Sequence, residues 1–139
     1  MREAITVQTV VNAPGATVWE SWNKPEYIIG WAFASADWEA PAAENDLRVG
    51  GKFRTVMAAK DKSTSFDFTG TYTAVKENEL IEYDMDDGRH VKVEFENTPN
   101  GFKVTETFEP ENENPLDLQR SGWAAILDNF RKFVESHNK

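Results

Sequence analysis

The feature that most constrains the fold is an amphipathic pattern near the end of the chain, in segment 114–135. Its apolar residues recur at steps of three and four, as they do on one face of an α-helix. These residues are Leu116, Trp123, Ile126, Leu127, Phe130, Phe133 and Val134. A helix of about 20 residues spans about 30 Å, so the rest of the chain has to supply an apolar surface of similar length.

That surface is predicted to be an antiparallel sheet. Between residues 52 and 108, short runs of alternating apolar residues are separated by turn sequences. Two of these turns, Asp87-Gly88 and Asn100-Gly101, favour tight hairpins because their central residues adopt positive φ readily. The middle of the chain is therefore expected to be a meander of neighbouring strands.

The first third of the chain adds a strand and two short helices. A strand is expected over residues 3–12, and the two helices over residues 14–30. Segment 31–46 has no sustained period and predicts a long loop. Together these elements predict an α+β fold, in which six to seven antiparallel strands pack on one long C-terminal helix.

Composition excludes several classes of protein. The 139 residues include five Trp and nine Phe, which is enough apolar area for one folded domain over residues 1–139. A net charge of −9 disfavours binding to nucleic acid or to anionic membranes, and the absence of cysteine excludes disulfides and thiolate chemistry. No apolar run approaches the roughly 20 residues of a membrane span, and no signal peptide is evident. The sequence predicts a cytoplasmic protein, a monomer or a weak dimer.

Motifs for catalysis are few. His90 and His137 are the only histidines, and neither has the spacing to another residue that a metal site requires. No Gly-x-Ser-x-Gly elbow and no phosphate-binding glycine loop is present. We therefore predict no catalytic residue, no metal and no cofactor.

Glu106 interrupts the apolar face of a predicted strand. Alternation places it on the same face as Val104 and Phe108, where a carboxyl group is costly unless it has a partner. A bulge or a strand end could turn the side chain outward. Alternatively, Glu106 is a polar anchor inside a ligand cavity or, less simply, an acid or base in a reaction.

Two residues of the predicted helix leave similar alternatives. Gly122 could allow the helix to approach the sheet closely, or it could be incidental. Gln119 lies one turn before Trp123 and could direct its amide either into the interior or toward the wet end of a groove.

Several segments, taken in order, resemble a known family. They are VNAPGATVWESW, residues 30–33, DLRVGGKF, FDFTGTY, LIEYDMDDGR, VTETFEPE and QRSGWAAILDNFRKFVE. They resemble the domain homologous to the C-terminal part of the activator of heat-shock protein 90 ATPase, within the SRPBCC superfamily of START-like and pollen-allergen-like proteins. The resemblance covers residues 5–135.

The resemblance implies a helix-grip fold, with a cavity between a curved sheet and the C-terminal helix. It implies an apolar or aromatic small molecule, lipid-like or polyphenol-like, as the ligand. The expected cavity residues are Trp31, Phe33, Trp38, Phe53, Met57, Phe68, Tyr72, Tyr83, Glu106, Gln119, Trp123, Leu127 and Phe130. The alternatives are a protein-interaction module associated with a chaperone, and an enzyme that uses Glu106 as acid or base.

Overall fold

The structure is a computed structural model that describes residues 3–137. In this part of the chain, seven strands form one sheet and are accompanied by three helices. The elements are β1 (Ile5–Val11), α1 (Gly15–Asn23), α2 (Pro25–Ile28), β2 (Trp38–Asn45), β3 (Lys52–Ala59), β4 (Ser65–Lys76), β5 (Leu80–Met85), β6 (His90–Thr98), β7 (Gly101–Phe108) and α3 (Leu116–His137).

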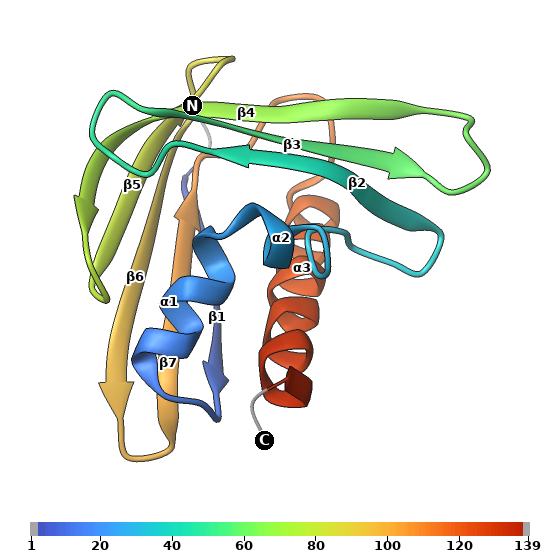
Figure 1. The fold of residues 1–139 in the computed structure, drawn as a ribbon. Helices are drawn as coiled ribbons and strands as arrows, with labels where there is room; N and C mark the ends of the chain where they lie inside the picture. Colours follow the sequence, from blue (N-terminus) through green and yellow to red (C-terminus); the bar gives the residue numbers. More distant parts are fainter. Residues whose placement is uncertain (1–2, 138–139) are drawn as a thin grey trace.

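The sheet is antiparallel throughout and curves around α3. Its strand order is β1-β7-β6-β5-β4-β3-β2, so the meander runs without interruption from β2 to β7 and β1 closes the other edge. In Figure 1, β2, β3 and β4 form an arm across the top, and α3 stands inside the curve of the sheet. This arrangement is the helix-grip fold, and it confirms the predicted fold class.

The apolar face of α3 is buried as its period predicts. Leu127, Phe130 and Val134 are fully buried. Trp123 stacks on Phe108 of β7, with ring centroids 4.0 Å apart and an angle of 8° between the rings. Dispersion and apolar burial at this face hold the helix against the concave side of the sheet.

Strand β4 departs from strict alternation. Along β4, alternation from Tyr72 would turn Val75 to the outer face. A bulge between Tyr72 and Ala74 shifts the register against β5, so that Val75 pairs with Ile81 and packs against the core. A bulge of this kind bends its strand locally and increases the twist.

The prediction of a long loop over residues 31–46 is wrong for its second half. Residues 38–45 form β2, the edge strand of the sheet. This strand lacks a clear alternation of large apolar residues because it is only partly covered, and it contains Pro41 at a register shift between Glu39 and Ala42. Proline is tolerated at such bulges on edge strands.

Two glycines have opposite packing environments. A Cβ at Gly70 of β4 would lie 2.7 Å from the ring of Phe53 and 2.9 Å from the carbonyl oxygen of Asp84. A Cβ at Gly122 of α3 would meet nothing within 4 Å, so Gly122 is not required for close packing of the helix on the sheet.

These environments predict opposite effects of the same substitution. Gly122→Ala is expected to stabilise the protein by about 0.5–1 kcal/mol, because alanine lowers the entropy of the unfolded chain and favours helix. Gly70→Ala is expected to destabilise it by about 1–3 kcal/mol through overpacking. Urea denaturation of the two variants measures both effects. A loss of stability in Gly122→Ala would contradict the open environment found around Gly122.

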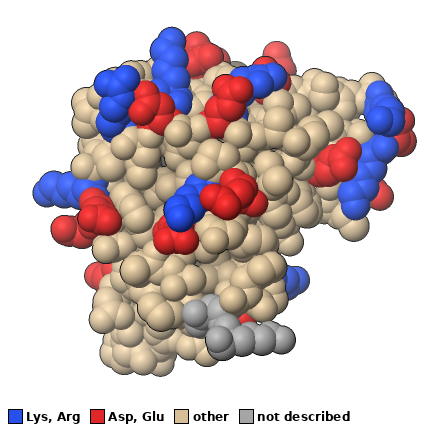
Figure 2. Space-filling view, viewed as in Figure 1, with Lys and Arg blue, Asp and Glu red and all other residues tan. Residues whose placement is uncertain are grey.

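The surface mixes charges of both signs. On the face shown in Figure 2, the lysine and arginine side chains stand next to aspartate and glutamate side chains and do not gather into a positive patch. No helix within residues 3–137 combines the length and the apolar character needed to cross a membrane.

Candidate functional site

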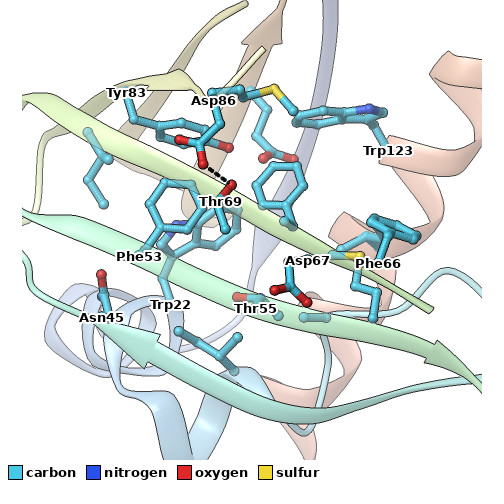
Figure 3. A pocket seen from close by; sticks show the side chains of 18 of the residues that line it. Trp22, Asn45, Phe53, Thr55, Phe66, Asp67, Thr69, Tyr83, Asp86 and Trp123 are labelled. Atoms are coloured by element: carbon cyan, nitrogen blue, oxygen red, sulfur yellow. Dashed lines mark hydrogen bonds between the residues drawn. The ribbon is translucent and has the colours of Figure 1, made fainter. Parts of the chain in front are cut away.

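A cavity of about 500 Å³ lies between the concave face of the sheet and α3. In Figure 3, Tyr83 and Phe53 lie on one side of it, and Trp123 and Phe66 lie on the other. The lining comes from almost every element, and its members are Trp22, Ile28, Trp31, Ala32, Asn45, Phe53, Thr55, Met57, Phe66, Asp67, Phe68, Thr69, Tyr72, Ile81, Tyr83, Met85, Asp86, Asp87, Arg89, Glu106, Trp123 and Ile126.

Aromatic rings form a continuous arc along the cavity wall. The centroids of Phe53 and Tyr83 are 4.7 Å apart, those of Phe68 and Tyr83 are 6.2 Å apart, and those of Phe68 and Trp123 are 6.0 Å apart. All three contacts are edge-to-face, the favoured geometry for aromatic pairs. Gly70 leaves the space into which the ring of Phe53 fits.

Glu106 is the buried acidic group of this cavity. Its side chain is 5% exposed, and its partners across the sheet are the apolar residues Val7 of β1 and Val93 of β6. Within residues 3–137, no side chain or backbone group donates a hydrogen bond to its carboxyl group. Burial in these surroundings raises the pKa of Glu106 to about 8.

The position of Glu106 decides between the alternatives that its sequence leaves open. The register of β7 with both β1 and β6 continues through Glu106 without a bulge, so alternation holds and the side chain points inward. An outward turn of Glu106 is therefore wrong. The strand tolerates the carboxyl group because it borders a cavity and does not pack directly into the core.

Two tyrosines add hydroxyl groups to the wall. The Tyr72 hydroxyl donates a hydrogen bond to Oδ1 of Asn45, whose Nδ2 donates to the carbonyl oxygen of Asn23 at 2.7 Å. Burial raises the pKa of Tyr83 well above its ordinary value, and the nearby charge of Glu106 adds to the shift. Burial also raises the pKa of Tyr72, so both phenols are neutral near pH 7.

The cavity meets solvent at three exposed acidic residues, Asp67, Asp86 and Asp87, which we call the acidic rim. Nε of Arg54 lies 2.8 Å from Oδ2 of Asp67, and Nε of Arg89 lies 2.9 Å from Oδ2 of Asp87. Asp86 accepts a hydrogen bond from the Thr69 hydroxyl, drawn in Figure 3. No group of three or more His, Cys, Asp or Glu side chains among the described residues is arranged to hold a metal ion.

The structure brings together eight of the thirteen residues predicted to line a cavity. They are Trp31, Phe53, Met57, Phe68, Tyr72, Tyr83, Glu106 and Trp123. The match follows largely from the alternation of β3 and β5, which places every second residue of each strand on the concave face.

The other five predicted residues lie outside the lining. Leu127 and Phe130 are buried in the core, where Phe130 packs against Trp22 and Trp31 with ring centroids 4.9 and 4.8 Å away. Trp38 is the first residue of β2, and the centroid of its ring lies 5.9 Å from that of Phe66. The sequence shows which face is apolar but not where along it the cavity lies.

Phe33 and Gln119 are held by backbone contacts elsewhere. The carbonyl oxygen of Phe33 accepts a hydrogen bond from Nδ2 of Asn129 at 3.4 Å. Nε2 of Gln119 donates to the carbonyl oxygens of Asn114 at 2.9 Å and Glu111 at 3.1 Å. Gln119 therefore fixes the turn that leads into α3 and directs no amide into the cavity.

Sequence reasoning left out the whole acidic rim and several residues of the apolar lining. Thr55, Ile81 and Met85 alternate with predicted members and could have been found by their period. Asp86, Asp87 and Arg89 belong to a turn, and their place beside the cavity depends on how far β4 extends past β5.

The fold and the cavity together define a helix-grip protein with an internal, largely aromatic site. The AHSA1 family, described as Activator of Hsp90 ATPase homolog 1-like protein, matches residues 12–135, and the chain belongs to this family. A search of curated proteins returned no match.

Solved structures agree with this assignment. An AHSA1-like protein from Aeromonas hydrophila is 43% identical, with a TM-score of 0.90 over 96% of this chain and 92% of that one. A protein from Cytophaga hutchinsonii is 50% identical, with a TM-score of 0.83 over 96% and 92% of the two chains. A protein from Chromobacterium violaceum, at 21% identity and a TM-score of 0.85 over 96% and 99%, shares the fold.

Proposed function

We propose that this protein binds a small molecule with an apolar or aromatic body in the cavity between the sheet and α3. The cavity itself carries the proposal, because its volume of about 500 Å³ suits a ligand of drug or metabolite size. Most of its wall is apolar and aromatic, and a few polar groups converge on it, as is usual in small-molecule sites. Lipid-like and polyphenol-like compounds are the first classes to test.

The tryptophans provide a test with internal controls. Trp22, Trp31 and Trp123 line the cavity, whereas Trp19 and Trp38 do not. In two-dimensional NMR spectra, a bound ligand is expected to shift the indole signals of the first three, and that of Trp123 most, because its ring faces the cavity from α3. Pooled lipids, flavonoids and other apolar metabolites are the probes. Spectra that stay unchanged across all pools, or that change only at Trp38, would contradict the proposal.

A second candidate function is binding to a chaperone. The observation that favours it is family membership, since the family is named for an activator of Hsp90 ATPase. Purified Hsp90 is expected to retain the protein in a pull-down at low salt if this function holds. Failure at low as well as high salt would count against it.

An enzymatic use of Glu106 as general acid or base is the remaining alternative. A carboxyl group with a pKa of about 8 at a cavity wall is suited to proton transfer near neutral pH. This alternative predicts an activity that Glu106→Gln abolishes while the fold stays intact. All three functions are proposed for a cytoplasmic protein.

A further inference from the structure

The cavity contains a carboxyl group that no part of the described chain satisfies. Glu106 is 5% exposed and receives no hydrogen bond from residues 3–137. Because Glu106 borders the cavity, a ligand that supplies a donor at this point forms a hydrogen bond shielded from bulk water. The recognition group of the ligand is therefore expected to meet Glu106.

The aromatic wall of the same cavity favours a positive charge on that group. Phe53, Phe68, Tyr83 and Trp123 form the aromatic arc of the wall. The face of an aromatic ring carries negative electrostatic potential and attracts ammonium groups, and several rings around one site form a cage for such cations.

The acidic rim adds to this preference. Asp67 and Asp87 are each paired with an arginine, and Asp86 has no cationic partner among the described residues. The three aspartates of the acidic rim and the two arginines paired with them leave a net formal charge of −1. The field at the entrance therefore attracts cations and repels anions.

Building on the proposed function, we infer that the cavity selects organic cations, in which an aromatic body carries a protonated or quaternary amine that is placed against Glu106. The aromatic body occupies the apolar part of the wall. The amine replaces part of its hydration with the carboxylate and the surrounding rings, which offsets the cost of its burial.

Proton release distinguishes this mode of binding. The pKa of Glu106 of about 8 means that the empty cavity holds a protonated carboxyl group near pH 7. A cation placed beside it favours the carboxylate, so the proton leaves as the ligand enters. Tyr83 is the titratable neighbour whose charge couples to that of Glu106, and its raised pKa keeps it neutral throughout. Arg89, at the rim, is paired with Asp87.

Three probes that share one ring system test the inference. They are N,N-dimethyl-(2-naphthylmethyl)amine, which is cationic at neutral pH, 2-naphthylmethanol, which is neutral, and 2-naphthoate, which is anionic. Affinities are measured by calorimetry near pH 7 in two buffers that differ in ionisation enthalpy. The variants are Glu106→Gln and, as a matched control, Glu96→Gln, which makes the same change at an exposed position of β6.

The amine is expected to bind at least about tenfold more tightly than the alcohol, with the naphthoate weakest, and to release about one proton per molecule bound. Glu106→Gln is expected to lower the affinity for the amine by about tenfold or more and to abolish proton release. Its affinity for the alcohol is expected to change by less than about threefold. Glu96→Gln is expected to leave the affinity for the amine unchanged.

The contradicting results separate the two proposals. An alcohol or naphthoate that binds as tightly as the amine overturns the selection of cations and leaves the ligand cavity in place. An equal loss of affinity for the amine and the alcohol in Glu106→Gln also overturns the selection of cations. If none of the three probes binds and the pooled library also causes no NMR shifts, both the selection of cations and the proposed function fail.

Discussion

Replacing Glu106 with glutamine is expected to make the protein more stable than the wild type at alkaline pH, by a margin that grows with pH. The carboxyl group has a pKa of about 8 when folded and 4.5 when unfolded. Between these values the folded state binds more protons than the unfolded state, so the stability of the wild type falls as pH rises. From about pH 5.5 to about pH 8.5, the margin in favour of Glu106→Gln should widen by about 3 kcal/mol.

Urea denaturation at a series of pH values measures this margin. Hydrogen bonds to Asp84 and Glu82 also raise the pKa of His90. Its stabilising effect is present at low pH and is lost as pH rises through that pKa, but it is common to both proteins and cancels in the difference. Glu96→Gln serves as the exposed control. Parallel stability curves for the wild type and Glu106→Gln would show that the carboxyl group is not buried in the folded state.

Phe130→Ala is expected to destabilise the protein by about 3–5 kcal/mol, the usual cost of truncating a fully buried phenylalanine. The ring of Phe130 is 0% exposed and packs on Trp22 and Trp31. Phe68→Ala is the matched comparison, because Phe68 is only partly buried and already faces the cavity. Its truncation enlarges an existing space and is expected to cost about 1–2 kcal/mol.

The comparison tests where the core ends and the cavity begins. Equilibrium denaturation gives both values, and Phe130→Leu offers a milder change, expected to cost about 1–2 kcal/mol, should Phe130→Ala not fold. Equal costs for Phe130→Ala and Phe68→Ala would contradict the division between core and cavity.

The faces of the helix and strands could be predicted because side-chain direction follows the period of the backbone. The step of three and four in α3 predicted the burial of Leu127 and Phe130, and the alternation of β5 predicted that Ile81 and Tyr83 share a face. Alternation alone also placed Glu106 inward. The cost of burying a carboxyl group argued for an outward turn, and that argument failed because the adjacent space is a cavity.

Features that depend on contacts distant in sequence could not be predicted. The cavity lies beside Trp123 but not beside Phe130, because Trp22 and Trp31 cover the later turns of α3. The bulge that turns Val75 inward leaves no mark in the residue pattern of β4. The rim depends on the relative lengths of β4 and β5, which place Asp86 next to Thr69.

The most direct test of the ligand cavity uses the methyl groups of Met57 and Met85, which line it from β3 and β5. The NMR signals of these two methyls, labelled with carbon-13, can be assigned among those of the three methionines with Met57→Leu and Met85→Leu variants. With N,N-dimethyl-(2-naphthylmethyl)amine or a ligand from the pooled library, we predict nuclear Overhauser effects from the ligand to both methyls, since the two flank one cavity. A ligand that shows such effects to neither methyl, while binding saturably, would place the binding site elsewhere and contradict the proposal.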